Sequence, residues 1–184
     1  MIVDSSALLE QATDDIVRSA FDSAGQRCSA LRVLCIQDDI YDDLLEMVKG
    51  NMQELKIGNP EELDTDIGPI INKTAKNKLD AYIKNKSDAG FQVYQSSTKI
   101  IDQYISPTVI EINTLRDLDE EQFGPILHVL KFKSSEIDNL IKDINDTGYG
   151  LTMGIHTRIE SRADLFSQNI FHYDLNQKFL KASC

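Results

Sequence analysis

Long hydrophobic runs, basic charge and paired cysteines are all scarce in this sequence of 184 residues. No apolar run approaches the roughly 20 residues that a membrane-spanning helix requires, so we expect no membrane span. The 19 lysines and arginines are outnumbered by 30 aspartates and glutamates, which gives a net charge of −11. An acidic surface repels phosphate backbones, so a nucleic-acid partner is not expected. No basic flank precedes an apolar run near the N-terminus, so a signal peptide is not expected either.

The three cysteines are an odd number at irregular spacing: Cys28, Cys35 and Cys184. They form no Cys-x-x-Cys pair and no Cys/His ligand set, so we expect neither a disulfide framework nor a metal site. Free thiols are typical of a reducing compartment, which favours a cytoplasmic location. Cys35 lies within an apolar run and is expected to be a structural core thiol.

The hydrophobic pattern alternates between helical and strand-like periods along the chain. It predicts helices over residues 13–23, 38–55, 72–86, 134–144 and 161–168, the fourth capped by Ser134 or Ser135. It predicts strands over residues 30–36, 91–94, 105–112, 126–132 and 151–157. Strands that alternate with helices indicate an α/β fold, an open, twisted and largely parallel sheet with flanking helices.

The chain is long enough for one domain with a hydrophobic core and too short for two domains that each have such a core. Residues 1–170 are predicted to form that domain. Residues 171–184 have no clear period and few side chains that would bury, so we expect a divergent, disordered or loosely packed tail.

Cys28 stands in residues 25–30, which read Gly-Gln-Arg-Cys-Ser-Ala, between a helical stripe and a buried strand-like run. Small residues on both sides would let a substrate approach the sulfur and the backbone N–H groups closely. A cysteine becomes a good nucleophile only as its thiolate. From the residues alone, a lone cysteine among small residues is more often a buried structural thiol than a nucleophile.

Residues 21–28 (Phe-Asp-Ser-Ala-Gly-Gln-Arg-Cys) are accompanied by three further blocks with distinctive patterns. Residues 56–69 contain Lys-Ile-Gly-Asn-Pro and Thr-Asp-Ile-Gly-Pro, residues 121–125 read Glu-Gln-Phe-Gly-Pro, and residues 145–157 contain Tyr-Gly-Leu-Thr. In this order the four blocks resemble the catalytic domain of the aldehyde dehydrogenase superfamily. The resemblance covers roughly residues 1–170 and implies that family's fold and an NAD(P)-dependent activity.

Residues 26–32, Gln-Arg-Cys-Ser-Ala-Leu-Arg, are most similar to the L-glutamate γ-semialdehyde dehydrogenases, also called 1-pyrroline-5-carboxylate dehydrogenases. The similarity is greatest to the dehydrogenase part of the bifunctional proline utilization A proteins. It implies oxidation of L-glutamate γ-semialdehyde to glutamate in proline catabolism, with Cys28 as the nucleophile. It also implies that Ser29 helps to hold the substrate's α-carboxylate, a contact that a hydroxyl donor makes well. The alternative is that Ser29 is merely a small residue at a crowded turn.

The same resemblance assigns the nicotinamide end of an NAD cofactor to Glu121 and Phe123. Glu121 would accept hydrogen bonds from the ribose hydroxyls, and Phe123 would pack against the nicotinamide ring. By composition alone, Glu121 belongs to the acidic run 117–121, which is typical of solvated surface, and an isolated phenylalanine is more often a core residue. NAD and NADP are not distinguished by these residues.

The sequence departs from the family pattern at both ends. The general-base glutamate, the oxyanion asparagine and the cofactor-binding domain are expected before the stretch that aligns with residues 1–4, and no Gly-x-Gly-x-x-Gly occurs. The resemblance stops near Ile170. We therefore expect a catalytic domain that is incomplete at both ends and inactive as an isolated chain, with a small-molecule aldehyde as the parent enzyme's substrate. The alternative is a non-enzymatic binding or assembly module, and exposed sheet edges would favour a homo-oligomer.

Overall fold

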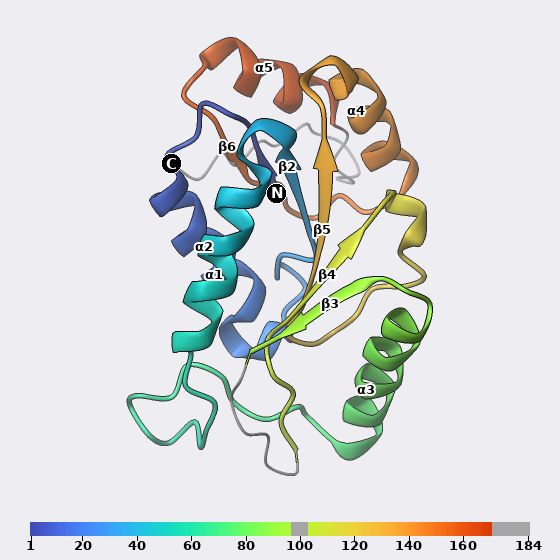
Figure 1. The fold of residues 1–184 in the computed structure, drawn as a ribbon. Helices are drawn as coiled ribbons and strands as arrows, with labels where there is room; N and C mark the ends of the chain where they lie inside the picture. The colour runs from blue at the N-terminus through green and yellow to red at the C-terminus, as the bar shows by residue number, and fades with distance from the viewer. Residues whose placement is uncertain (97–102, 171–184) are drawn as a thin grey trace.

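A six-stranded sheet flanked by helices forms the centre of the computed structural model, which describes residues 1–96 and 103–170 (Figure 1). The strands are β1 (Ile2–Val3), β2 (Val33–Gln37), β3 (Gln92–Gln95), β4 (Thr108–Ile112), β5 (Ile126–Phe132) and β6 (Ile155–His156). The α-helices are α1 (Leu9–Phe21), α2 (Tyr41–Glu54), α3 (Lys73–Asp88), α4 (Ile137–Asp146) and α5 (Glu160–Asn169).

The sheet has the strand order β3-β4-β5-β2-β1-β6, and only β3 runs antiparallel to its neighbour. β5 lies at the centre, where Ile126, Leu127 and Val129 are completely buried. A strand covered on both faces has an almost continuous apolar sequence, which is why the pattern over residues 126–132 predicted this strand to the residue. The predicted α/β fold with a largely parallel open sheet is confirmed.

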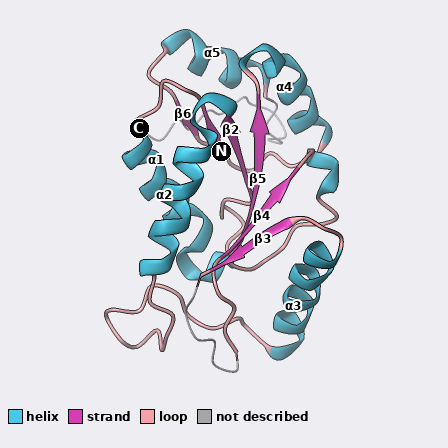
Figure 2. Ribbon diagram, viewed as in Figure 1, coloured by secondary structure: helices cyan, strands magenta, loops and turns pink. Residues whose placement is uncertain are grey.

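Helices cover both faces of the sheet (Figure 2). α1 and α2 lie together on one side, and α3 lies on the other. The face that α1 buries is made by Ala12, Ile16 and Ala20, none of which has any exposed surface. Their spacing of four residues places them on one stripe of the helix. α5 lies near α4, and the Arg162 side chain donates to Ser134 Oγ at 3.0 Å.

Helix starts agree with the sequence only in part. The predicted start of α3 near Asn72 is confirmed, and Asn72 caps the helix, since its side-chain oxygen accepts from the backbone N–H of Ala75 at 2.8 Å. The predicted serine cap of α4 is wrong. Residues 134–136 form a short 3₁₀ turn, and Glu136 rather than a serine stands before Ile137 at the helix start, without a side-chain cap.

The last described strand is shorter than predicted. The sequence suggested a strand over residues 151–157, but only Ile155–His156 pairs, and it pairs with β1. β1 itself was not predicted, because two residues are too few to show a period. The buried Asp4 joins the ends of both strands by accepting from Ser6 Oγ at 2.6 Å and from Thr157 Oγ1 at 2.5 Å. The prediction of a separate tail over residues 171–184 lies outside the described residues.

No helix in residues 1–96 and 103–170 is long and apolar enough to cross a membrane.

Candidate functional site

Two loops that are far apart in the sequence meet at the amino-terminal ends of β2 and β5. The loop with Cys28 leads into β2, and the loop with Glu121 leads into β5. β2 and β5 are parallel neighbours, with Val33 opposite His128, so the segments that precede them enter the sheet at the same edge. The parallel pairing of β2 with β5 therefore brings the Cys28 loop and the Glu121 loop to the same edge of the sheet, although they are far apart in the sequence.

The Cys28 loop starts from a left-handed turn at the end of α1. Ser23, Ala24 and Gly25 have φ values of 55°, 54° and 63°, a region that residues with a side chain rarely adopt. A Cβ atom on Gly25 would collide with the carbonyl oxygen of Gly124, so the two loops touch through their backbones there. This close approach requires a glycine at position 25.

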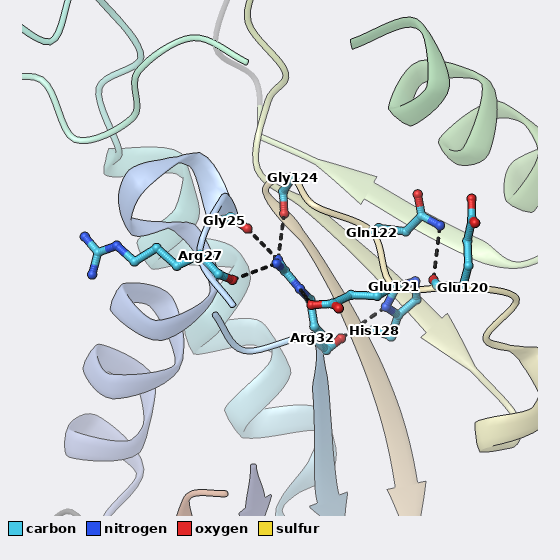
Figure 3. A network of polar contacts seen from close by, with 8 residues as sticks. All are labelled: Gly25, Arg27, Arg32, Glu120, Glu121, Gln122, Gly124 and His128. Atoms are coloured by element: carbon cyan, nitrogen blue, oxygen red, sulfur yellow. Dashed lines mark hydrogen bonds and ion pairs between the residues drawn. The ribbon is translucent and has the colours of Figure 1, made fainter. Parts of the chain in front are cut away.

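Arg32 fastens the two loops together (Figure 3). On the Cys28 side, its guanidinium donates to the carbonyl oxygens of Gly25 at 2.6 Å and Arg27 at 2.9 Å. On the other side, it donates to Glu121 Oε1 at 3.2 Å and to the carbonyl oxygen of Gly124 at 3.3 Å. An arginine that makes several hydrogen bonds at once fixes the positions of its partners far more than a single surface ion pair does.

The Arg32 guanidinium also lies over the Phe123 ring, with its carbon 4.8 Å from the ring centroid. Only 14% of the Arg32 side chain is exposed, against 31% for Glu121. Burial lowers the pKa of Arg32, and the hydrogen bond and charge of Glu121 act in the opposite direction. A guanidinium is charged at any ordinary pH, and the acceptors around Arg32 replace the water that it has lost.

A cavity of about 300 Å³ opens between these loops and the sheet. Cys28 and Glu121 both line it, and Val33, Cys35 and His128 form part of its floor. Its remaining wall is mainly apolar and includes Leu115, Leu118, Ile144, Tyr149, Leu151 and Met153. A mostly apolar pocket with a few polar groups is the usual form of a small-molecule site.

The four residues assigned from the sequence are only partly brought together. Cys28 is exposed and shares the cavity with Glu121. Ser29 is exposed, and among the described residues it does not line this cavity although its neighbours Cys28 and Ala30 do. Phe123 is 46% exposed and contacts Arg32 rather than the cavity wall. The alternative interpretation of Phe123 as an ordinary core residue is therefore wrong, while its proposed contact with the cofactor stays a prediction.

The two described thiols have different surroundings. Cys28 lies at the surface, whereas Cys35 is 2% exposed in the middle of β2. Burial raises the pKa of the Cys35 thiol to about 11, because a thiolate loses its hydration there. The expectation that Cys35 is a structural core thiol is confirmed.

His128 supports the Arg32 backbone from below the cavity. Its Nδ1 lies 3.1 Å from the Arg32 carbonyl oxygen and its Nε2 lies 2.8 Å from the Tyr82 hydroxyl. Because a carbonyl can only accept, Nδ1 carries the proton and Nε2 accepts from Tyr82. Burial lowers the pKa of His128 to about 4, so the ring is neutral near pH 7.

Sequence reasoning missed Arg32 and His128 as parts of the site. Arg32 follows the motif around Cys28 at the start of a buried strand, and an arginine in such a place needs partners, which is the signal that the sequence offers. His128 stood in a strand-like run as an apparently ordinary packed histidine. Its contact with the Arg32 carbonyl depends on the β2–β5 register, which no local pattern specifies.

Among residues 1–96 and 103–170, no group of three or more histidine, cysteine, aspartate or glutamate residues is arranged to hold a metal ion.

Comparison with known proteins identifies the source of this arrangement. Residues 1–173 match the aldehyde dehydrogenase family. The chain belongs to that family. It is 48% identical over 168 residues to the bifunctional protein PutA of Salmonella typhimurium, a match that covers 87% of this chain and 13% of the relative. It is 37% identical over 155 residues to the 1-pyrroline-5-carboxylate dehydrogenase of Anoxybacillus flavithermus, covering 83% of this chain and 30% of the relative.

A solved structure agrees with these relatives. The crystal structure of a bifunctional proline utilization A protein superimposes with a TM-score of 0.88 at 39% identity, over 92% of this chain and 17% of that one. The fold and family expected from the four sequence blocks are confirmed. The chain spans between 13% and 30% of the length of the curated relatives named above.

Proposed function

We propose that this chain carries the nucleophile and the nicotinamide-ribose contact of a 1-pyrroline-5-carboxylate dehydrogenase, which oxidises L-glutamate γ-semialdehyde to glutamate in proline catabolism. The observation that carries the proposal is the single cavity that Cys28 and Glu121 both line. The choice of this enzyme rests on the relatives, since both PutA and the 1-pyrroline-5-carboxylate dehydrogenase match the chain over more than four fifths of its length.

Cys28 supplies the chemistry that an exposed cysteine at a cavity wall can perform. Its thiolate attacks the aldehyde carbonyl, a carbon–sulfur bond forms, and the carbonyl electron pair moves to oxygen to give a thiohemiacetal. The acceptance of a hydride from that adduct is what NAD or NADP supplies when it is bound. The thioester left on Cys28 is hydrolysed by water, which releases the carboxylic acid and restores the thiol.

Glu121 fits a hydroxyl-rich ligand. An ionised carboxylate can accept about four hydrogen bonds, and the described contact with Arg32 engages Oε1. The side chain remains 31% exposed, and Phe123 beside it is 46% exposed, so both groups are open to a ribose and an aromatic ring. In this proposal Glu121 binds ribose hydroxyls and Phe123 packs against the nicotinamide.

Ser29 has the proposed role of donating a hydrogen bond to the substrate's α-carboxylate. Its exposure next to Cys28 supports that role, because an exposed hydroxyl is open to a ligand. Its place outside the 300 Å³ cavity means that the substrate carboxylate would lie beside this cavity rather than in it.

The 184-residue polypeptide on its own is proposed to be inactive. The sequence contains no Gly-x-Gly-x-x-Gly, and the chain covers only 13% of the PutA that it matches. Losing a general base alone typically costs about 10²–10⁴-fold in rate. Self-association through the edge strands β3 and β6 is part of the proposal, because edges recruit further strands.

An exchange of segments tests the function directly. The matched segment of Salmonella PutA is replaced by the corresponding residues of this chain, and NADH formation from L-glutamate γ-semialdehyde is measured. Activity within about tenfold of the parent enzyme supports the proposal. The exchanged segment should fit the parent fold, because this chain superimposes on a related PutA structure with a TM-score of 0.88. A folded chimera that binds NAD but forms no NADH would instead favour the non-enzymatic module.

The Ser29→Ala variant of the same chimera tests the proposed hydrogen bond between Ser29 and the substrate's α-carboxylate. We expect a higher KM for L-glutamate γ-semialdehyde, by roughly 10- to 100-fold for a hydrogen bond to a charged group. The KM for propanal, which has no carboxylate, should stay unchanged. Equal effects on both aldehydes would exclude the carboxylate contact.

A further inference from the structure

Arg32 is the described residue whose side chain bonds to both loops of the site. Its four acceptors divide evenly, with Gly25 and Arg27 in the Cys28 loop and Glu121 and Gly124 in the other. A guanidinium has five N–H donors in a rigid fork, so these contacts engage most of its capacity. Figure 3 shows the fork between the two loops with its acceptors on opposite sides.

The position of Glu121 depends on this arginine. Glu121 belongs to an acidic loop that is largely exposed and has little local structure of its own. An isolated surface ion pair would not fix such a side chain, since exposed pairs contribute little. Arg32 differs because it is only 14% exposed, is held by three backbone carbonyls, and covers the Phe123 ring.

The position of Arg32 is in turn fixed from the sheet. Its backbone carbonyl accepts from the His128 backbone N–H at 2.9 Å and from the His128 ring at 3.1 Å. The ring is held by Tyr82 on α3. A chain of contacts therefore runs from α3 through β5 to the arginine and ends at Glu121.

We propose that Arg32 is a positioning residue that makes the Cys28 loop and the Glu121 loop one rigid unit. It holds the Glu121 carboxylate and the Phe123 ring at a fixed place relative to the Cys28 sulfur, without itself contacting the reacting atoms. The contribution of Arg32 to catalysis rests on the proposed function, in which a hydride passes from a substrate on the Cys28 loop to a cofactor held by the Glu121 loop. The coupling of the loops stands without that function.

Hydrogen exchange followed by mass spectrometry on the 184-residue chain measures this coupling. Arg32→Met should speed amide exchange by about tenfold or more both in residues 25–31 and in residues 119–126, because hydrogen bonds to a charged group are lost in each. Arg27→Met is the matched control. It removes a neighbouring positive charge whose described side-chain bonds go only to Ser23, so residues 119–126 should not change.

Peptides from α1 and α2 report global unfolding in the same experiment. If Arg32→Met speeds their exchange as well, Arg32→Lys replaces it, since lysine keeps the charge but has three donors for four acceptors. Faster exchange in both loops with Arg32→Lys supports the proposal. A change confined to one loop, or an equal change in residues 119–126 with Arg27→Met, overturns it.

Chemical rescue separates positioning from general destabilisation. Methylguanidinium at tens of millimolar is added to Arg32→Ala, with urea at the same concentration as the neutral control. The proposal predicts that methylguanidinium, but not urea, slows exchange in both loops together. Slowing by neither compound, or equal slowing by both, would contradict it. These readouts need no cofactor and no turnover, so an inactive PutA chimera with coupled loops would refute the proposed function alone.

Discussion

The carbonyl oxygen of Gly124 occupies the place that a Cβ atom on Gly25 would require. Gly25 has a φ of 63°, so both its backbone conformation and its surroundings exclude a side chain. The two glycines are 99 residues apart and meet beside the guanidinium of Arg32, which donates to the carbonyl oxygens of both. The contact brings the loop of Cys28 against the loop of Glu121.

Gly25→Ala is therefore expected to destabilise the chain by about 2–4 kcal/mol, from a strained φ together with overpacking against backbone. Urea unfolding at constant m-value measures the change in the free energy of unfolding. Gly50→Ala is the matched control, since Gly50 lies inside α2 and a Cβ there meets nothing within 4 Å. It should stabilise the chain by about 0.5–1 kcal/mol. Equal effects of the two substitutions would refute the close approach.

His128 should make stability depend on pH between about 4 and 6.5. Its pKa is lowered from its ordinary value of 6.5 to about 4 by burial, so the unfolded chain binds the extra proton in this range. The free energy of unfolding should therefore rise with pH through the window and be fully gained above 6.5. The contribution is at most about 3 kcal/mol.

His128→Gln provides the comparison, because glutamine does not titrate. Urea unfolding of both chains at pH 4.5 and pH 7 gives the difference that belongs to His128, since all other groups are common to both. We expect the stability of His128→Gln to vary less over this interval than that of the parent chain. An identical pH dependence in both chains would mean that the pKa of His128 is the same in the folded and unfolded states, which would contradict its burial.

Cys28 should be alkylated faster than Cys35 in the folded chain. Cys28 is exposed, whereas Cys35 is 2% exposed with its pKa raised to about 11. Iodoacetamide labelling at pH 7, resolved by peptide mapping, should modify Cys28 while leaving Cys35 unmodified until urea unfolds the chain. Rapid labelling of Cys35 without denaturant would contradict the buried position of β2.

Much of the fold follows from the sequence because its long elements have clear periods. The run over residues 126–132 predicted β5 to the residue, and Asn72 marked the start of α3. The failures fall where local pattern carries little information. β1 has two residues, and α4 starts from a 3₁₀ turn that Ser134 and Ser135 do not cap.

The site was predictable as a family pattern but not as an arrangement. The motifs around Cys28 and Glu121 suggested two contributions to one site, and the shared cavity supports that interpretation. Nothing local indicated that Arg32 would join their loops, since that depends on β2 and β5 becoming parallel neighbours. The loops with Cys28 and Glu121 precede β2 and β5, whereas open α/β sheets usually bind ligands in the loops at the carboxyl ends of the strands.

The central claim is that Cys28 is the nucleophile, and its removal from the PutA chimera tests that claim most directly. NADH formation from L-glutamate γ-semialdehyde is compared in the chimera, its Cys28→Ala variant and its Cys35→Ala control. We predict that Cys28→Ala lowers the rate by roughly 10³-fold or more while the fold and NAD binding persist. Cys35→Ala, which trims a buried thiol that lines the same cavity but has no proposed part in the reaction, should lower the rate far less than Cys28→Ala does. A Cys28→Ala chimera that still forms NADH within about tenfold of the parent rate would contradict the account.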